Sequence, residues 1–257
     1  MQNTVKDVRD EFVNILKASN YVTDKSGCKM LEIIGQSFTI DPKNVEDYSI
    51  FGEINYDYID RELDWYLTKS CNINAIKGEI PKIWKQVATP DGYINSNYGW
   101  VTFSTENGYN GKCQYEFALK ALTGDESSRR SMVIYNRPTM QVEYNKGGMS
   151  DFMCTNAVEF LIRDNKLHLN VQMRSNDAWA GFRNDLQWHI YVMKKMCQDY
   201  NTLTGKNIEL GSIHWQAASL HIYEKDFWRV EAYAKTKNHL ITKAEYDAIL
   251  EKEQNRL

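Results

Sequence analysis

The chain has 257 residues, and its 31 lysines and arginines against 34 aspartates and glutamates give a formal net charge of −3. Hydrophobic residues make up 42% and charged residues 25%, which is typical of a globular protein with a buried core and excludes a disordered chain. The mean hydropathy of −0.58 and the lack of a run of about 18 apolar residues argue against a membrane span, and the near-neutral charge argues against broad duplex DNA binding. Because the first residues also lack the apolar stretch of a signal peptide, we expect a cytoplasmic protein without direct nucleic-acid or membrane partners.

The cysteines and the motif content narrow the chemistry further. The five cysteines are an odd number without a Cys-x-x-Cys pair or a histidine at zinc-finger spacing, so we expect neither a disulfide framework nor a metal site. The sequence also lacks a Walker phosphate loop, a GxGxxG motif and an HExxH motif. No repeat and no Pro- or Ser-rich linker interrupts it, which predicts a single domain over residues 1–257.

The hydrophobic pattern predicts a mixture of helices and strands. The first helix follows Thr4, which together with Asp7 has the pattern of a capping box. The predicted segments are, in chain order, a helix at 4–16, a turn at 24–27, a strand at 30–38, a helix at 58–69, a loop region at 92–111, a helix at 113–122, a turn at 124–128, a buried strand at 131–135, a tight loop at 145–150, a strand at 167–173, a helix at 188–196 and a short strand at 219–223. Because strict βαβ alternation is missing, the order predicts an α+β fold rather than a Rossmann sheet.

Cys154 is a candidate nucleophile. A polar loop precedes it and an apolar stretch follows it, a placement that can expose a thiol at a cleft. The thiolate is the reactive form, so a cation or a helix N-terminus is needed nearby. The alternative is a cysteine that only fills the core, which is the commoner role of this residue type.

Glu62 is a candidate general acid or base. The predicted helix at 58–69 has an aromatic face, and Glu62 falls on it. Burial among tyrosine and tryptophan raises the pKa of a carboxyl group toward the working pH. The alternative is that helical rotation brings Glu62 to the rim beside Arg61, where it forms a solvated ion pair.

Three arginines are candidates for a phosphate site. Arg129 and Arg130 precede a predicted strand, and Arg174 with Ser175 closes another, while Lys25 lies in a turn at a strand entrance. Guanidinium groups match phosphate oxygens bidentately, so these residues together form a plausible site for a phosphate monoester. The alternative is that each arginine forms a surface ion pair, which is the commoner role of a single arginine at a strand end.

The densest polar stretch of the chain spans residues 173–185. Its side chains, among them Asn176 and Asp185, can hydrogen-bond the edge of a heterocyclic base; alternatively, Asp185 caps the helix that follows. His221 and Tyr223 lie two apart on a predicted strand, so both face the same side and can reach a sugar hydroxyl.

Taken in order, these segments resemble the thymidylate synthase superfamily, and most closely its phage-type deoxycytidylate 5-hydroxymethyltransferases. The likeness runs from about residue 22 to residue 233 and rests on several motifs in register: DKSGCK, RELDWY, PKIWKQVA, INSNYGW, SRRSM, YNKGGMSDFMCTN, MRSNDAWAGFRND and SLHIY. It implies a mixed β-sheet packed with helices, with one face of the sheet at a homodimer interface.

The resemblance also implies roles for individual residues. The catalytic group comprises the nucleophile Cys154, the glutamate Glu62, the active-site tyrosine Tyr98 and the base-contacting Asp185. The implied phosphate ligands are Lys25, Arg174 and Ser175, with Arg129 and Arg130 supplied by the partner subunit. The implied ligands of the sugar 3′-hydroxyl are His221 and Tyr223, and the implied folate positions are Ile83, Trp84, Asp177 and Gly181.

The implied substrates are dCMP and 5,10-methylenetetrahydrofolate. Synthases acting on uracil carry asparagine at the position of Asp185, whereas a carboxylate accepts from the 4-amino group of cytosine, and Asn176 is expected on the same edge. The implied reaction adds Cys154 to carbon 6, transfers the one-carbon unit to carbon 5 and traps it with water, with Glu62 carrying protons.

Two departures from the synthases fit the hydroxymethyltransferases: Thr155 replaces the usual histidine, and Gln86-Val87 replaces a second tryptophan. Two alternatives stay open. One is a methylating or dUMP-using relative, against which Asp185 argues. The other is a nucleotide-binding dimer without catalysis, against which the joint presence of Cys154 and Glu62 argues. Preference for ribose or deoxyribose stays open as well.

Overall fold

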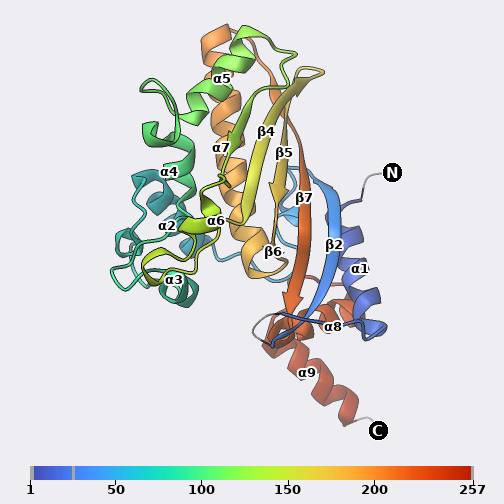
Figure 1. Ribbon diagram of the computed structural model, residues 1–257. Coiled ribbons are helices and arrows are strands. Elements are labelled where there is room, and N and C mark those ends of the chain that lie inside the picture. The colour runs from blue at the N-terminus through green and yellow to red at the C-terminus, as the bar shows by residue number, and fades with distance from the viewer. Residues whose placement is uncertain (1–2, 25–26, 256–257) are drawn as a thin grey trace. The chain divides into compact units, whose positions relative to one another are not determined.

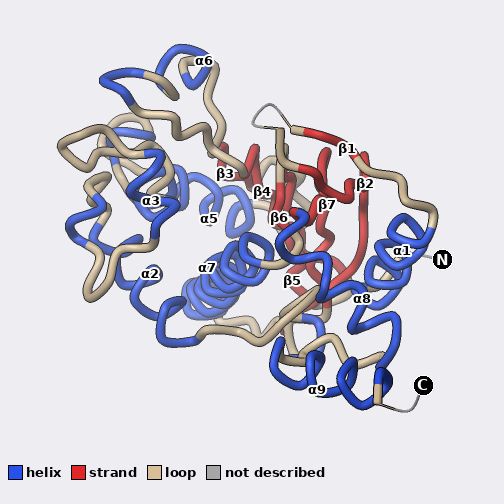
Figure 2. The backbone as a smooth tube through the Cα atoms, turned by 90° about the horizontal axis from the view of Figure 1, so that it is seen from below, coloured by secondary structure: helices blue, strands red, loops and turns tan. Residues whose placement is uncertain are grey.

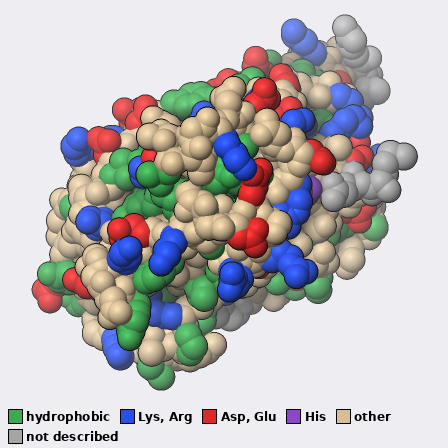
Figure 3. All heavy atoms as spheres, turned by 90° about the horizontal axis from the view of Figure 1, so that it is seen from above, with side chains coloured by type: hydrophobic (Ala, Val, Ile, Leu, Met, Phe, Trp, Pro, Cys, Tyr) green, Lys and Arg blue, Asp and Glu red, His purple; other side chains and the backbone are tan. Residues whose placement is uncertain are grey.

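The computed structural model of the protein describes residues 3–24 and 27–255 (Figure 1). The chain folds into two compact units: unit 1 comprises residues 1–54, 175–187 and 214–257, and unit 2 comprises residues 55–174 and 188–213. The single domain over the whole chain stays a prediction. Within the described residues no helix is long and apolar enough to cross a membrane. Acidic and basic side chains are interspersed over the face shown in Figure 3.

Unit 1 contains helices packed on part of a β-sheet. Its elements are α1 (Val5–Lys17), β1 (Val22–Thr23), β2 (Lys29–Ile40), β6 (Asn176–Asp177), α8 (Phe227–Thr236), α9 (Lys243–Gln254), the first residues of α7 (Ala180–Thr204) and most of β7 (Glu209–Tyr223). Helix α1 packs against β2 and α8, as Figure 2 shows. Phe51 packs between α1 and α8. Its ring meets Phe12 of α1 edge-on at 5.8 Å and Tyr233 of α8 at 6.0 Å.

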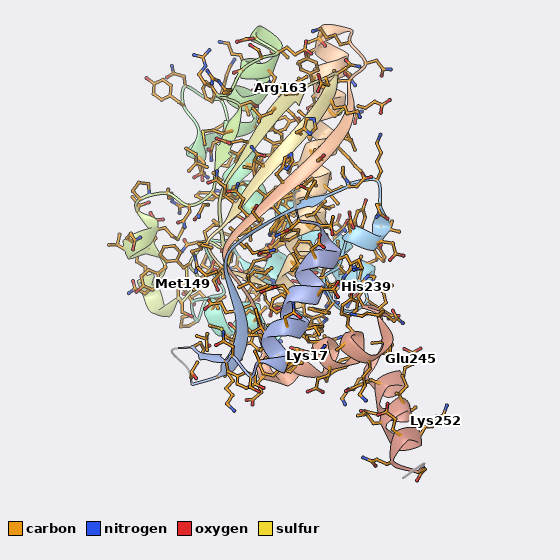
Figure 4. The ribbon with its side chains drawn as sticks, turned by 90° about the vertical axis from the view of Figure 1, so that its right-hand side faces the viewer. Lys17, Met149, Arg163, His239, Glu245 and Lys252 are labelled. Atoms are coloured by element: carbon orange, nitrogen blue, oxygen red, sulfur yellow. The ribbon has the colours of Figure 1, made fainter. Side chains whose placement is uncertain are left out.

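The start of α1 follows from its sequence. The Thr4 hydroxyl accepts from the Asp7 amide, and the Asp7 carboxylate accepts from the Thr4 amide at 2.8 Å, so two otherwise unpaired amides are satisfied. The buried residues of α1 share the helical spacing read from the sequence. The predicted first helix and its capping box are confirmed. In Figure 4, Lys17 marks the other end of α1, and Glu245 and Lys252 mark the beginning and the later part of α9.

Unit 2 is built around an antiparallel sheet with helices. Its elements are α2 (Tyr56–Thr68), α3 (Lys82–Val87), α4 (Tyr98–Phe103), α5 (Gln114–Gly124), β3 (Met132–Ile134), α6 (Met140–Glu143), β4 (Thr155–Arg163), β5 (Lys166–Met173) and the part of α7 from residue 188. Strand β4 pairs with both β3 and β5, so that Val158 faces Val133 on one side and Val171 on the other, all three buried. Helix α5 packs on β3 and β4.

The hairpin that joins β4 and β5 ends in a two-residue turn. Asp164 and Asn165 both have positive φ angles, 50° and 59°, which suits the right-handed twist of the paired strands. Figure 4 labels Arg163 at this end of the hairpin. At the opposite end the register shifts between Thr155 and Ala157, a bulge directly after Cys154. The irregularity therefore lies where the candidate nucleophile enters the sheet.

Most predicted elements are confirmed, and the structure corrects three expectations. The loop region at 92–111 contains helix α4, because the Asn97 side chain accepts from the Trp100 amide and the helix buries its apolar face. Helix α7 begins at Ala180, so Asp185 lies inside it and does not cap it. The strand at 219–223 is only the end of β7, which is 15 residues long.

Candidate functional site

Cys154 and Arg174 lie side by side at the ends of the paired strands β4 and β5. The Arg174 amide donates to the Cys154 carbonyl at 2.9 Å. The Arg174 guanidinium donates to the carbonyls of Met153 and Phe152 at 2.8 and 2.6 Å, and its Nη2 lies 3.8 Å from the Cys154 Sγ. A guanidinium at the sulfur favours the thiolate. The predicted need for a cation beside Cys154 is therefore met.

Arg174 keeps donors for a ligand. A guanidinium has five N–H groups, and the contacts to Phe152, Met153 and the sulfur occupy those of Nε and Nη2. Nη1 makes no hydrogen bond with any residue that the structure describes. The ring of Phe152 lies under the guanidinium, 4.7 Å from its carbon, and holds its plane. The guanidinium is therefore held through Nε and Nη2, while the two N–H groups of Nη1 stay available for a ligand.

Tyr98 is linked to the residue that follows the nucleophile. It is 3% exposed at the start of α4, and its hydroxyl accepts from the Thr155 hydroxyl at 2.9 Å. Thr155 also contacts the sulfur of Met173 at 3.2 Å. The Tyr98 ring stacks on Tyr66 of α2 with centroids 5.4 Å apart. The structure therefore brings Tyr98 and Cys154 into one neighbourhood within unit 2.

Asp151 is a functional candidate that sequence reasoning missed. Its carboxylate accepts from the amides of Asn95 and Ser96 at 2.7 and 2.8 Å and from the Ser96 hydroxyl at 2.7 Å. Burial raises the pKa of this carboxyl group above its ordinary value. The loop before Cys154 is thereby tied to the loop before α4. Since 55 residues separate Asp151 from Ser96, no local pattern indicates the pair.

Glu62 lies in an aromatic environment on α2. It is 6% exposed, and its Oε1 accepts from the Tyr58 hydroxyl and, at 3.3 Å, from the Trp84 indole, which also donates to Tyr58 at 2.9 Å. Burial raises the pKa of Glu62 to about 7. Arg61 instead binds Asp57 and main-chain carbonyls. The expected burial of Glu62 is confirmed, and the alternative of a solvated ion pair is wrong.

Helix α3 carries two expected folate positions. Trp84 contacts Glu62 as described and meets the ring of Trp65 edge-on at 5.3 Å. Ile83, in contrast, is 57% exposed. A single exposed isoleucine is common on protein surfaces, so the folate role of Ile83 and Trp84 stays a prediction.

Arg129 and Arg130 lie in the exposed segment between α5 and β3. The Arg130 amide donates to the Ser128 hydroxyl at 3.2 Å, while neither guanidinium makes a hydrogen bond or an ion pair with the described part of the chain. Both side chains are therefore available to a ligand or to another subunit. Lys25, the further expected phosphate ligand, lies outside the described residues.

Asn176 and Asp185 form a hydrogen-bonded pair in unit 1. Asn176 lies on β6, which pairs with β7, and its Nδ2 donates to the Asp185 Oδ2 at 3.0 Å. Asn176 is 2% exposed, and its Oδ1 has no hydrogen-bond partner among the residues described. A buried acceptor without a donor in the protein can accept from a ligand or from a water molecule.

Two expected folate positions border this pair. A Cβ built on Gly181 would lie 3.4 Å from Asp177, 3.5 Å from the Asn176 amide and 3.7 Å from the Asp185 carboxylate. Asp177 accepts from the amides of Trp179 and Ala180 at 2.8 and 3.0 Å, so it caps the start of α7. Sequence reasoning had considered Asp185 for that capping role.

His221 and Tyr223 lie at the end of β7 on one face, as predicted. Their rings are 5.1 Å apart and meet at 79°. The His221 Nδ1 lies 3.2 Å from the Ser219 hydroxyl oxygen, and Ser219 donates to Glu32 of β2. Sequence reasoning missed Glu32 and Ser219, because their pairing depends on which strands are neighbours. Ser175, the remaining expected phosphate ligand, directly precedes β6 and is half-buried.

Comparisons with known proteins show the family of the chain. The family model described as thymidylate synthase matches residues 8–252. The chain is 46% identical to deoxycytidylate 5-hydroxymethyltransferase of Enterobacteria phage T4 over 244 residues, which covers 95% of this chain and 96% of that protein. The enzyme of the same name from phage T2 is 46% identical over 245 residues, with the same coverage. Thymidylate synthase of Francisella tularensis subsp. holarctica is 25% identical over 234 residues, covering 86% of this chain and 82% of that protein.

The fold is also found in a solved structure. Thermostable thymidylate synthase A from Bacillus subtilis superposes with a TM-score of 0.64 at 21% identity, covering 88% of this chain and 84% of that one. The predicted α+β, thymidylate synthase-like fold with a mixed sheet is confirmed. The homodimer interface on the sheet stays a prediction.

Proposed function

Because this chain belongs to the thymidylate synthase family, we propose that it transfers a one-carbon unit from 5,10-methylenetetrahydrofolate to carbon 5 of dCMP and completes the transfer with water. The products are 5-hydroxymethyl-dCMP and tetrahydrofolate. One observation carries the choice of cytosine, namely the Asp185 carboxylate held by Asn176.

The pair in unit 1 presents acceptors to the base. The 4-amino group of cytosine has two hydrogens, one for Asp185 and one for the unpartnered Oδ1 of Asn176. One proton shared between Asp185 and ring nitrogen 3 completes the recognition. Uracil presents the lone pairs of oxygen 4 at the same place, where both protein groups are acceptors. A buried mismatch of this kind discriminates strongly.

Cys154 is the proposed nucleophile. Its thiolate, favoured by the Arg174 guanidinium, adds to carbon 6 and turns carbon 5 into a nucleophile. The Nη1 of Arg174 is the proposed donor to the substrate phosphate, and Ser175 and Lys25 are proposed as further phosphate ligands on the strength of the family motifs. Tyr98 fixes Thr155, and with it the start of β4, beside the reacting sulfur.

Glu62 is the proposed proton carrier. Its Oε1 is held by Tyr58 and Trp84, and its Oε2 makes no hydrogen bond with the described residues, which leaves it for a water molecule. With a pKa of about 7, the carboxyl group exchanges protons near neutral pH. The folate supplies a carbon at the oxidation level of formaldehyde, so trapping with water needs no oxidation of the folate. Ile83 and Trp84 would hold the folate ring on α3, and Asp177 and Gly181 are proposed contacts in unit 1.

The phosphate site is proposed to be shared between two copies of the chain. Arg129 and Arg130 are exposed and their guanidinium groups have no partner in the described part of their own chain. In a symmetric dimer each subunit can donate this pair to the other. We therefore propose a homodimer in which the partner's arginines complete each phosphate site.

Product analysis tests the proposal. The purified protein is incubated with methylenetetrahydrofolate and, separately, dCMP, dUMP or CMP; nucleotides are analysed by mass spectrometry while dihydrofolate is followed by absorbance. We expect a gain of one CH₂O unit on dCMP without dihydrofolate. A methylated product with dihydrofolate contradicts the water step, and no product from any nucleotide contradicts the enzymatic proposal.

A further inference from the structure

Three side chains of unit 1 form a series of hydrogen bonds that the proposed reaction does not explain. Glu32 lies on β2, and Ser219 and His221 lie on β7. Ser219 donates to the Glu32 carboxylate, and its oxygen lies 3.2 Å from the His221 Nδ1. Glu32 and Ser219 are half-buried, and His221 is 6% exposed. This series of hydrogen bonds therefore ends at the buried imidazole of His221.

The direction of both hydrogen bonds follows from which of the three side chains has a proton to donate. A carboxylate only accepts, so the single proton of the Ser219 hydroxyl points to Glu32. The bond between Ser219 and His221 must then be donated by the ring, from Nδ1. A neutral imidazole has one ring proton, so Nε2 carries a lone pair. Nε2 makes no hydrogen bond with the residues described.

We infer that Glu32 and Ser219 are positioning residues that fix His221 with its proton on Nδ1, so that Nε2 accepts a hydrogen bond from a nucleotide hydroxyl. The inference rests on the proposed function, because it takes that hydroxyl to be the 3′-hydroxyl of dCMP. The buried donor of a histidine commonly sets the tautomer that its other nitrogen uses for a ligand.

The acceptor at Nε2 gives the site a preference among nucleotides. An acceptor at Nε2 binds a free hydroxyl, which has a proton to give, and repels a 3′-phosphate or a 3′-ester, which has none. The site therefore selects a mononucleotide with a free 3′ end over the same base inside a nucleic-acid chain. The backbone at His221 is fixed, because its carbonyl accepts from the Ala178 amide at 2.7 Å, and the ring contacts Tyr223 in a T-shaped arrangement.

Nitrogen NMR of the full-length protein tests the tautomer without any turnover. The chain has five histidines, so ¹⁵N-histidine labelling gives a simple spectrum, and the His221→Gln variant assigns the signal. We expect the wild-type proton on Nδ1 and a shift of the proton toward Nε2 in Ser219→Ala or Glu32→Ala. Ser37→Ala, on the exposed surface of β2, is the matched control and leaves the signal unchanged. A wild-type proton on Nε2 overturns the inference.

Binding measurements test the link to the sugar. The Kd values of dCMP and of its 3′-deoxy analogue are measured by titration calorimetry. Ser219→Ala is expected to raise the Kd of dCMP about tenfold and that of the analogue by less than about twofold. Equal weakening of both ligands contradicts the role at the 3′-hydroxyl, even where the tautomer is as inferred. If neither ligand binds the wild type, the proposed substrate is wrong while the NMR result still decides the tautomer.

Discussion

The two units give their candidate residues different tasks in the proposed function. In unit 2, Arg174 donates to main-chain carbonyls around Cys154, and burial raises the pKa of Glu62 although Tyr58 and Trp84 donate to its carboxylate. In unit 1, Asn176 donates to Asp185 and Ser219 donates to Glu32. Each of these pairs leaves a hydrogen-bond acceptor for the proposed ligand. In the proposed function, unit 2 sets the reactivity of a thiol and a carboxyl group, whereas unit 1 presents acceptors that select the ligand. Substitutions in unit 2 should therefore affect mainly the rate, and substitutions in unit 1 mainly the choice of ligand.

The largest effect is expected at the nucleophile. Cys154→Ser should lower kcat by about 10⁴-fold or more while the Kd of dCMP changes little, because a hydroxyl is a far weaker nucleophile than a thiolate. Rates come from product analysis and the Kd from calorimetry. Cys28→Ser, at an exposed position, is the matched control. Turnover by Cys154→Ser within tenfold of wild type would remove Cys154 from the mechanism.

The next effect is expected at the proton carrier. Glu62→Gln should lower kcat by roughly 10²–10³-fold, since the amide cannot exchange protons. Asp64→Asn, exposed on the same helix, serves as the control. An unchanged kcat in Glu62→Gln would assign the proton transfers to another group.

The same substitution has a signed effect on stability. The pKa of Glu62 lies at about 7 in the folded protein against an ordinary value of 4.5, so the unfolded chain ionises first. The contribution of Glu62 to the free energy of unfolding should therefore fall between these pH values, by about 3 kcal/mol, and stay level above them. Urea unfolding at a series of pH values should show this fall in the difference between the wild type and Glu62→Gln, because the other titrating groups are common to both. Parallel curves would contradict the raised pKa.

In unit 1 the selectivity should change more than the rate. Asp185→Asn should shift the ratio of kcat/KM for dCMP over dUMP by about 10³-fold toward dUMP, because the asparagine amide can donate to oxygen 4. Competition between the two nucleotides, read by mass spectrometry, measures the ratio directly. Loss of both activities in equal measure would mean that Asp185 serves the chemistry, which would break the division between the units.

The arginine pair sharpens the comparison, because it is a binding element within unit 2. Arg129→Gln with Arg130→Gln should raise the KM for dCMP roughly 10–100-fold. Mixed with inactive Cys154→Ser protein under subunit exchange, it should restore activity to about a quarter of wild type, since half of the dimers then carry one intact site. Failure to complement would place the arginines in their own subunit's site.

The smallest effect is expected for Tyr58→Phe. The Tyr58 hydroxyl donates to Glu62 and lowers its pKa against the effect of burial. Without this bond the pKa of Glu62 should rise, and the ascending limb of the kcat profile should move to higher pH by about one unit, with a few-fold loss near neutral pH. A limb that moves to lower pH would contradict the assigned hydrogen bond.

Local signals in the sequence predicted part of this structure correctly. Helix α1 was predictable because its cap and its apolar spacing lie within 13 residues, and the burial of Glu62 followed from neighbours on the same helix. Helix α4 was not, because it depends on the Asn97 cap and on burial of Tyr98 in its surroundings. The site residues themselves were assigned through family motifs.

Long-range pairs escaped the sequence altogether. Glu32 and Ser219 are 187 residues apart, and only the adjacency of β2 and β7 brings them together. Asp151 and Ser96 likewise meet through loops whose positions the whole of unit 2 decides. In both cases residue type and spacing contain no information about the partner.

The contacts of Trp84 give the protein an optical reporter. Its indole donates both to Tyr58 and to Glu62, so we expect the emission of this fluorophore to change with the charge on that carboxylate. The chain has seven tryptophans, and Trp65 meets the ring of Trp84 at 5.3 Å, so a Trp84→Phe variant assigns the signal. Stopped-flow fluorescence can then follow the protonation of a single buried group during one turnover, in real time and without a label.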